Sequence, residues 1–159
     1  MGTVQTIGVR YANGELSFED AVRVGCSSCA SSGGGCQFLG TAGTSQVIAE
    51  GLGLALTHSA LSPSGEVIWK DLARKSAKAV MAMEKMNITT KDVLTDKSIE
   101  NAMVIHAAFG GSTNLLLHLP AIAFAAGCRR PTVDDWARIN KEVPRLVSVL
   151  PMGPVNYPT

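Results

Sequence analysis

The chain has 159 residues, enough for one domain with a substantial core, which excludes a disulfide-stapled miniprotein. Its formal net charge of +1 gives no basic field for a phosphate backbone, so nucleic acid is excluded as an expected partner. No run reaches the ~18 apolar residues of a membrane span and no export signal is visible, so we expect a cytoplasmic protein with no membrane partner.

The first third of the chain predicts a strand, a helix and a loop. Residues 3–11 have strand-like composition and end at the Asn-Gly pair 13–14, which favours a turn. Ser17, three residues before Asp20, is typical of the N-cap of a short helix that ends near residue 24. A loop of cysteine, serine and glycine follows.

Beyond residue 40 the pattern is mostly helical, and no internal repeat or linker divides residues 1–159. The expected helix starts are Thr41, Ser64, Thr89 with Asp92, Thr95 or Asp96, Ser112, and Thr132 with Asp135. In the second of these helices we expect a buried stripe of Ile68, Leu72, Ala79 and Met83. Residues 112–126 are apolar nearly all round, which predicts a helix buried on every side, and residues 146–150 are a candidate single strand.

Three thiols lie close together in residues 25–36 (GCSSCASSGGGC). Cys26 and Cys29 have the spacing of half a zinc or iron–sulfur site, and the three glycines before Cys36 allow the backbone to approach a cluster. A second paired set of ligands is missing from the sequence. The pattern therefore leaves open a metal or cluster site, a small zinc-binding module, and plain buried thiols in a tight loop.

Three blocks of the sequence, in the same order, resemble the dihydroxy-acid and phosphogluconate dehydratase family. They are residues 33–46 (GGGCQFLGTAGTSQ), residues 109–123 (FGGSTNLLLHLPAIA), and residues 136–140 (WARIN) with 150–154 (LPMGP). Residues 26–46 and 132–136 look closest to the sugar-acid (D-xylonate) branch of that family. Because family members are several times longer, the resemblance implies that this chain is a fragment from the later part of the N-terminal, cluster-binding domain.

The resemblance also implies a fold: a mainly α segment of an α/β domain, with several helices and one or two short strands. It implies a hydro-lyase that converts a sugar acid to a 2-keto-3-deoxy acid. In the family scheme a cluster iron acts as Lewis acid on the leaving C3 hydroxyl, Mg²⁺ holds the carboxylate, and a serine alkoxide removes the C2 proton. The expected partners are the sugar-acid substrate, the remainder of the same polypeptide, and further copies in a homo-oligomer.

Only part of this apparatus corresponds to residues of this chain. By resemblance, Cys36 is one of three ligands to an iron–sulfur cluster of 2Fe–2S or 4Fe–4S type, and the Mg²⁺ ligands and the catalytic serine lie outside the chain. Ser112, Thr113 and Asn114 open a helix whose N-terminus is a candidate site for a substrate carboxylate, although a helix cap explains the same residues. By itself the chain is expected to be inactive. The alternative interpretation is a non-catalytic helical body that serves packing and subunit contact.

Overall fold

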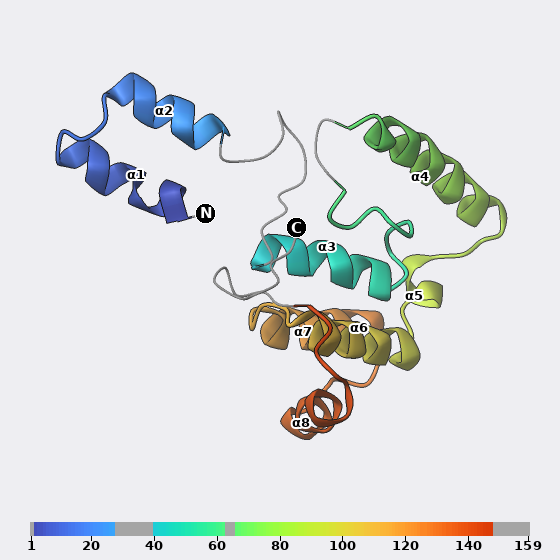
Figure 1. Ribbon diagram of the computed structural model, residues 1–159. Coiled ribbons are helices and arrows are strands. Elements are labelled where there is room, and N and C mark those ends of the chain that lie inside the picture. Colours follow the sequence, from blue (N-terminus) through green and yellow to red (C-terminus); the bar gives the residue numbers. More distant parts are fainter. Residues whose placement is uncertain (1, 28–39, 63–65, 148–159) are drawn as a thin grey trace.

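The computed structural model describes residues 2–27, 40–62 and 66–147, and within these ranges the chain forms helices and no strand (Figure 1). The expectation of a segment with one or two short strands is therefore wrong for the described part. The helices are α1 (Gly2–Ala12), α2 (Phe18–Ser27), α3 (Thr41–Gly51), α4 (Ile68–Lys85), α5 (Thr90–Val93), α6 (Asp96–Phe109), α7 (Leu115–Ala126) and α8 (Val133–Glu142).

The predicted strand at residues 3–11 lies within helix α1, which forms an antiparallel hairpin with α2 (Figure 1). Apolar residues recur at helical spacing here, at Val4, Ile7 and Tyr11, although the composition is rich in strand-forming types. The Ile7 side chain lies against Gly25 of α2, with its Cδ1 4.0 Å from the place of a β-carbon on that glycine. Packing of one apolar face thus outweighs the local preference for a strand.

The second predicted strand is also absent from the described residues. Leu146 and Val147 have no strand structure, and residues 148–150 lie outside the described part. The Leu146 amide donates instead to the carbonyl of Ala108, near the end of α6, at 2.7 Å. This single hydrogen bond ties the segment after α8 to the helix bundle.

Most of the predicted helix starts are confirmed, because they depend on residues only three or four positions apart. The start predicted at Ser64 lies outside the described residues, and α4 begins at Ile68. Ser17 Oγ accepts the amide of Asp20 at 3.0 Å, as a cap should. Capping boxes start the three later helices, at Thr89 with Asp92, Thr95 with Ser98, and Thr132 with Asp135. Gly110 and Gly127 end α6 and α7 with positive φ angles of 72° and 75°.

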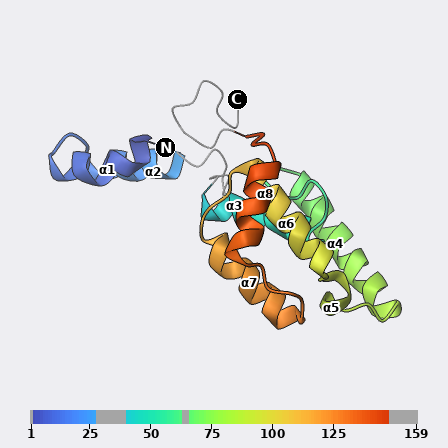
Figure 2. The same cartoon turned by 90° about the horizontal axis from the view of Figure 1, so that it is seen from below.

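The core lies where α6 meets α3, α7 and α8, and Figure 2 shows these four helices together. Its buried side chains come from all four helices and from the residues just before α6. They are Ile48, Leu52, Leu94, Ile99, Ala102, Met103, Ala107, Leu115, Leu119, Ala123, Trp136 and Ile139. Leu119 and Ile139 are the largest side chains that are fully buried.

Two helices are less buried than their sequences predict. In α7 only Leu115, Leu119 and Ala123 are buried, on one face, whereas Leu117 is 74% and Phe124 70% exposed. The prediction of a helix buried on every side is therefore wrong within this chain. In α4, Leu72 is the one buried residue of the expected stripe. None of the described helices is long and apolar enough to cross a membrane.

Candidate functional site

The candidate site lies where the first turn of α3 meets the turn between α6 and α7. Ser112 is at its centre, because both of its backbone polar groups are bonded to side chains of other helices. Its amide donates to Thr44 Oγ1 of α3 at 2.9 Å. Its carbonyl oxygen lies 3.0 Å from His106 Nε2 of α6. The backbone at Ser112 is thus held from two sides.

His106 is buried beneath this turn, with 8% of its surface exposed. Because a carbonyl oxygen only accepts hydrogen bonds, Nε2 is the donor in this contact. The other ring nitrogen, Nδ1, is buried with no hydrogen-bond partner among the described residues. The ring also meets Trp136 of α8 edge to face, with 5.2 Å between ring centroids. His106 is therefore a hydrogen-bonded histidine of the core.

Gly111 is glycine because no space remains for a side chain. A β-carbon there would lie 2.5 Å from His106 Cδ2 and 3.0 Å from Thr44 Cγ2. By contrast, the neighbouring Gly110 is required by its left-handed backbone at the end of α6. The Gly-Gly pair therefore does two separate jobs: it ends one helix and it lets the next turn lie directly on His106.

Side chains from α3 and from the start of α7 form a small polar cluster beside this turn. Asn114 Nδ2 donates to Thr41 Oγ1 at 2.7 Å, and the hydroxyls of Thr41 and Ser112 are 3.4 Å apart. Thr113 is exposed, and no bond from its hydroxyl is seen within the described residues. The segment of Ser112, Thr113 and Asn114 thus lies beside Thr41 and Thr44, which the sequence analysis did not include among the site residues. The sequence signal for these two threonines is that they are three residues apart and precede the apolar face of a helix.

The helix start differs in detail from the expected one, since α7 begins at Leu115 and not at Ser112. The Leu115 amide donates to the Ser112 carbonyl at 3.1 Å, and the Asn114 amide lies 3.4 Å from Ser112 Oγ. The Ser112 amide is bonded to Thr44. In this turn the Thr113 amide therefore remains, among the described residues, without a hydrogen-bond acceptor. Binding groups for a ligand here would come chiefly from side chains.

Below the polar cluster a groove of about 220 Å³ runs between α3 and α7. Its floor is almost entirely apolar. The lining side chains are those of Thr41, Thr44, Ser45, Ile48, Ala49, Leu52, Leu54, Ser112, Asn114, Leu115, His118 and Ile122. His118 is exposed at its edge.

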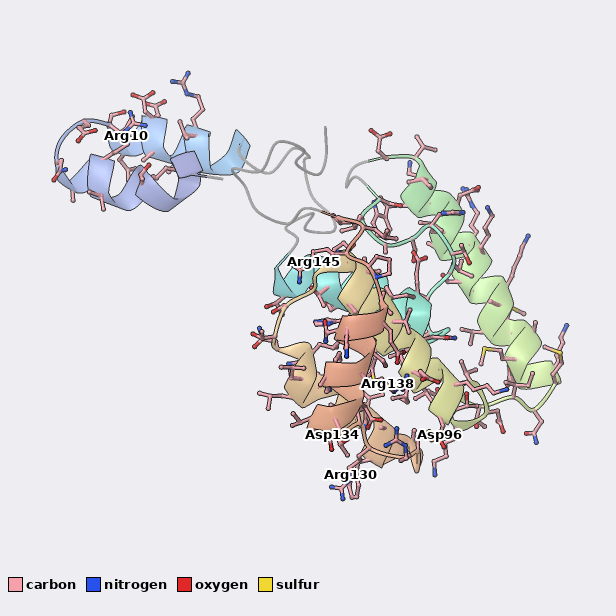
Figure 3. All side chains as sticks on the ribbon, turned by 60° about the horizontal axis from the view of Figure 1, so that its bottom comes forward. Arg10, Asp96, Arg130, Asp134, Arg138 and Arg145 are labelled. Carbon is pink, nitrogen blue, oxygen red and sulfur yellow. The ribbon has the colours of Figure 1, made fainter. Side chains whose placement is uncertain are left out.

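A second cleft, of about 160 Å³, lies between α6 and α8 and is polar. Both of its arginines are already paired: Arg129 makes two bonds of 2.8 and 2.9 Å to Asp135, and Arg138 reaches Glu100 at 2.9 Å. The bonds from Arg129 hold the pKa of the Asp135 carboxyl well below its ordinary value. Figure 3 shows Arg138 well away from Arg145, which packs over Gly110 and has no carboxylate partner within the described residues. The Arg145 guanidinium is therefore a positive charge close to the Ser112 turn that makes no ion pair within the described residues.

Two of the four cysteines belong to the part of the chain that the structure describes. Cys29 and Cys36 lie outside the described residues, and Cys26 is in the last turn of α2. Cys128 is a free thiol that contacts the Leu94 carbonyl at 3.3 Å. Among the described residues no three histidine, cysteine or carboxylate side chains converge as metal ligands, so this part of the chain alone does not build a metal site.

Comparison with known proteins gives a consistent result. Residues 2–158 match the family model described as dihydroxy-acid/6-phosphogluconate dehydratase N-terminal. The chain is 72% identical over 158 residues to D-xylonate dehydratase YjhG of Escherichia coli (strain K12), and 68% identical to D-xylonate dehydratase YagF of the same organism. Each alignment covers 99% of this chain and 24% of the relative.

A more distant relative is the dihydroxy-acid dehydratase of Leifsonia xyli subsp. xyli (strain CTCB07), 41% identical over 140 residues. That alignment covers 88% of this chain and 24% of the relative, so the chain spans about a quarter of the length of the curated relatives it matches. The family match covers residues 2–158 and so includes the segments of both Cys36 and Ser112. Because it covers nearly the whole chain, this protein belongs to the dihydroxy-acid/6-phosphogluconate dehydratase family.

Proposed function

We propose that this chain forms part of a sugar-acid dehydratase that removes water from D-xylonate or a similar acid and yields a 2-keto-3-deoxy acid. The high identity to two D-xylonate dehydratases over nearly the whole chain supports this substrate class. In this proposal the active enzyme includes the remaining three quarters of a polypeptide of the relatives' length, and the present chain alone is inactive.

The structural observation that supports the proposal is the hydrogen-bonded junction between α3 and the Ser112 turn. Cys36 precedes the first described residue of this region, Gly40, by four positions. An extended chain spans at most ~3.6 Å a residue, so the two Cα atoms are within about 14 Å of each other in any conformation. The junction therefore joins the segment of the proposed cluster ligand to the segment of the proposed substrate contacts.

Each proposed residue has a definite task. The Cys36 thiolate is a ligand to an iron–sulfur cluster, whose iron, when bound, supplies a Lewis acid for the leaving hydroxyl. Ser112, Thr113 and Asn114 offer two hydroxyls and an amide, which bind the hydroxyl or carboxylate oxygens of a sugar acid. The apolar groove below these side chains keeps water away from the side of the bound sugar acid that faces away from the polar cluster. Mg²⁺ and its ligands belong to the part of the enzyme outside this chain.

The test uses the full-length dehydratase that contains this chain, prepared without oxygen. Cys36→Ser is compared with wild type in iron content, sulfide content and D-xylonate dehydration. Cys128→Ser is the matched control, because that thiol contacts a backbone carbonyl beside the core and has no proposed role. We expect loss of cluster and activity in the first variant and retention of both in the second. A Cys36→Ser enzyme that keeps its cluster would refute the assignment.

A second role, packing against other protein, is favoured by the apolar surface of α7. Leu117 and Phe124 are 74% and 70% exposed on a helix with no charged residue, an arrangement that is costly in water. We propose that the remainder of the polypeptide or a second copy covers this face. Light scattering and binding of a hydrophobic dye test this role on the isolated chain, and a monomer that binds no dye would contradict it.

A further inference from the structure

We propose that Thr44 and His106 are positioning residues that fix the Ser112 turn in the geometry the dehydratase needs. This inference rests on the function proposed above. Neither residue is assigned to substrate or cofactor here. They act through Ser112, which they hold by its amide and its carbonyl. We call this arrangement, formed by Thr44, His106 and the Ser112 backbone, the Ser112 brace.

The Ser112 brace holds both backbone polar groups of Ser112. A turn residue normally leaves its amide and carbonyl to neighbours in sequence or to water. The Ser112 amide is instead bonded to a residue 68 positions away, on α3, at 2.9 Å. Its carbonyl takes bonds from His106 Nε2 at 3.0 Å and from the Leu115 amide at 3.1 Å. With both ends held, rotation of the backbone at Ser112 is restricted, and its hydroxyl keeps its place near Thr41.

The side chains of the Ser112 brace are themselves fixed by burial and packing. Thr44 is 3% and His106 8% exposed, so neither side chain is free to follow a moving turn. The His106 ring is placed by its edge-to-face contact with Trp136, and Gly111 lies directly on it. Side chains of α3 and α6 thus hold the serine before α7, and Trp136 of α8 supports the histidine. A site held by packed side chains keeps its geometry better than a site on a free loop.

The Ser112 turn is connected to the first turn of α3. Asn114 and Ser112 both contact Thr41, in the first turn of the helix that follows the Cys36 segment. Thr44 lies three residues further along the same helix. The brace therefore fixes the spacing between the segment that carries the proposed cluster ligand and the side chains that we propose contact the substrate. A change in this spacing should weaken substrate binding and leave the cluster in place.

The test compares Thr44→Val with Thr44→Ser in the full-length dehydratase. Valine keeps the shape but leaves the Ser112 amide without an acceptor, whereas serine keeps the hydroxyl. We expect Thr44→Val to raise KM for D-xylonate about tenfold with a smaller change in kcat, because a lost buried hydrogen bond has about this effect. Thr44→Ser should restore most of the affinity. Iron content should equal that of wild type in both, and the same Thr→Val change at exposed Thr57 should alter nothing.

His106 provides an independent pair of variants. Glutamine places an amide nitrogen near the position of Nε2, so His106→Gln should retain part of the substrate affinity, whereas His106→Leu should not. Hydrogen exchange of the peptide around Ser112 gives a readout that does not depend on activity. We expect faster exchange in Thr44→Val than in Thr44→Ser. If Thr44→Val does not fold, the His106 pair and its exchange rates decide the question.

The possible failures are distinguishable. A wild-type enzyme that does not dehydrate sugar acids would refute the proposed function, while the exchange data would still report on the brace. Equal KM values for Thr44→Val and Thr44→Ser, with equal exchange at Ser112, would overturn the brace in an active enzyme. Loss of iron in Thr44→Val would also overturn it, because the residue would then support the cluster and not the substrate contacts.

Discussion

Replacement of Gly111 by alanine tests the close approach on which the candidate site is built. The backbone at Gly111 does not have a left-handed conformation, so alanine meets no backbone strain there. The new β-carbon would lie 2.5 Å from His106 Cδ2, a distance that real atoms do not keep. Either the imidazole ring or the turn must therefore move.

The structure indicates how much this movement costs. The ring is confined by Trp136 and by its bond to the Ser112 carbonyl, and it has little exposed surface. Overpacking a confined site costs about 1–3 kcal/mol, and loss of the hydrogen bond adds about 1 kcal/mol. We therefore expect Gly111→Ala to lower the free energy of unfolding by about 2–4 kcal/mol.

Urea unfolding followed by circular dichroism measures this change, with the slope of the transition as a check that the unfolding reaction is the same. Gly8→Ala is the matched control. Gly8 lies inside α1 with nothing within 4 Å of its added β-carbon, so alanine should stabilise the helix by about 0.5–1 kcal/mol. If Gly111→Ala were as stable as wild type, the contact between this turn and His106 would not exist as described.

Three further changes probe the core, the ion pairs and the helix caps. Leu119→Ala, at a fully buried side chain, should cost about 3 kcal/mol in urea unfolding, whereas Leu117→Ala, at a 74% exposed one, should change stability by less than about 0.5 kcal/mol. Bonds from Arg129 lower the pKa of Asp135, so its carboxylate stabilises the fold fully above its unfolded pKa of about 3.9 and progressively less below it. Asp135→Asn should therefore flatten the loss of stability measured between pH 5 and pH 2. Thr95→Ala removes the cap of α6 and should cost about 1 kcal/mol by the same unfolding assay.

Sequence reasoning succeeded where a structure depends on near neighbours. The caps at Thr89, Thr95 and Thr132 each depend on a residue three positions ahead, and all three are confirmed. The strand predicted at residues 3–11 failed for the opposite reason, since contact with α2 decides the conformation. Residues 112–126 were predicted to be buried on all sides, and composition could not show which face meets the rest of this chain.

The candidate site was predictable as two separate motifs but not as one place. The blocks around Cys36 and around Ser112 were both identified, yet nothing in the sequence pairs Thr44 with Ser112 across 68 positions. His106 presented the same difficulty, because a lone histidine on a buried face has no signature of what its ring contacts. Only the packing of α6 between α3 and α8 determines that its Nε2 reaches the Ser112 carbonyl.

The two helices that border the groove share a pattern that explains why the polar groups collect at one end. On α3, Thr41 and Thr44 in the first turn are followed on the same face by Ile48. Along α7, Ser112 before the helix is followed by buried Leu115 on the face toward the core. On both helices, side chains with hydroxyl groups are thus followed by apolar side chains, and this change occurs at the same height along the groove. A polar molecule held at this hydroxyl end would therefore lie above an apolar floor.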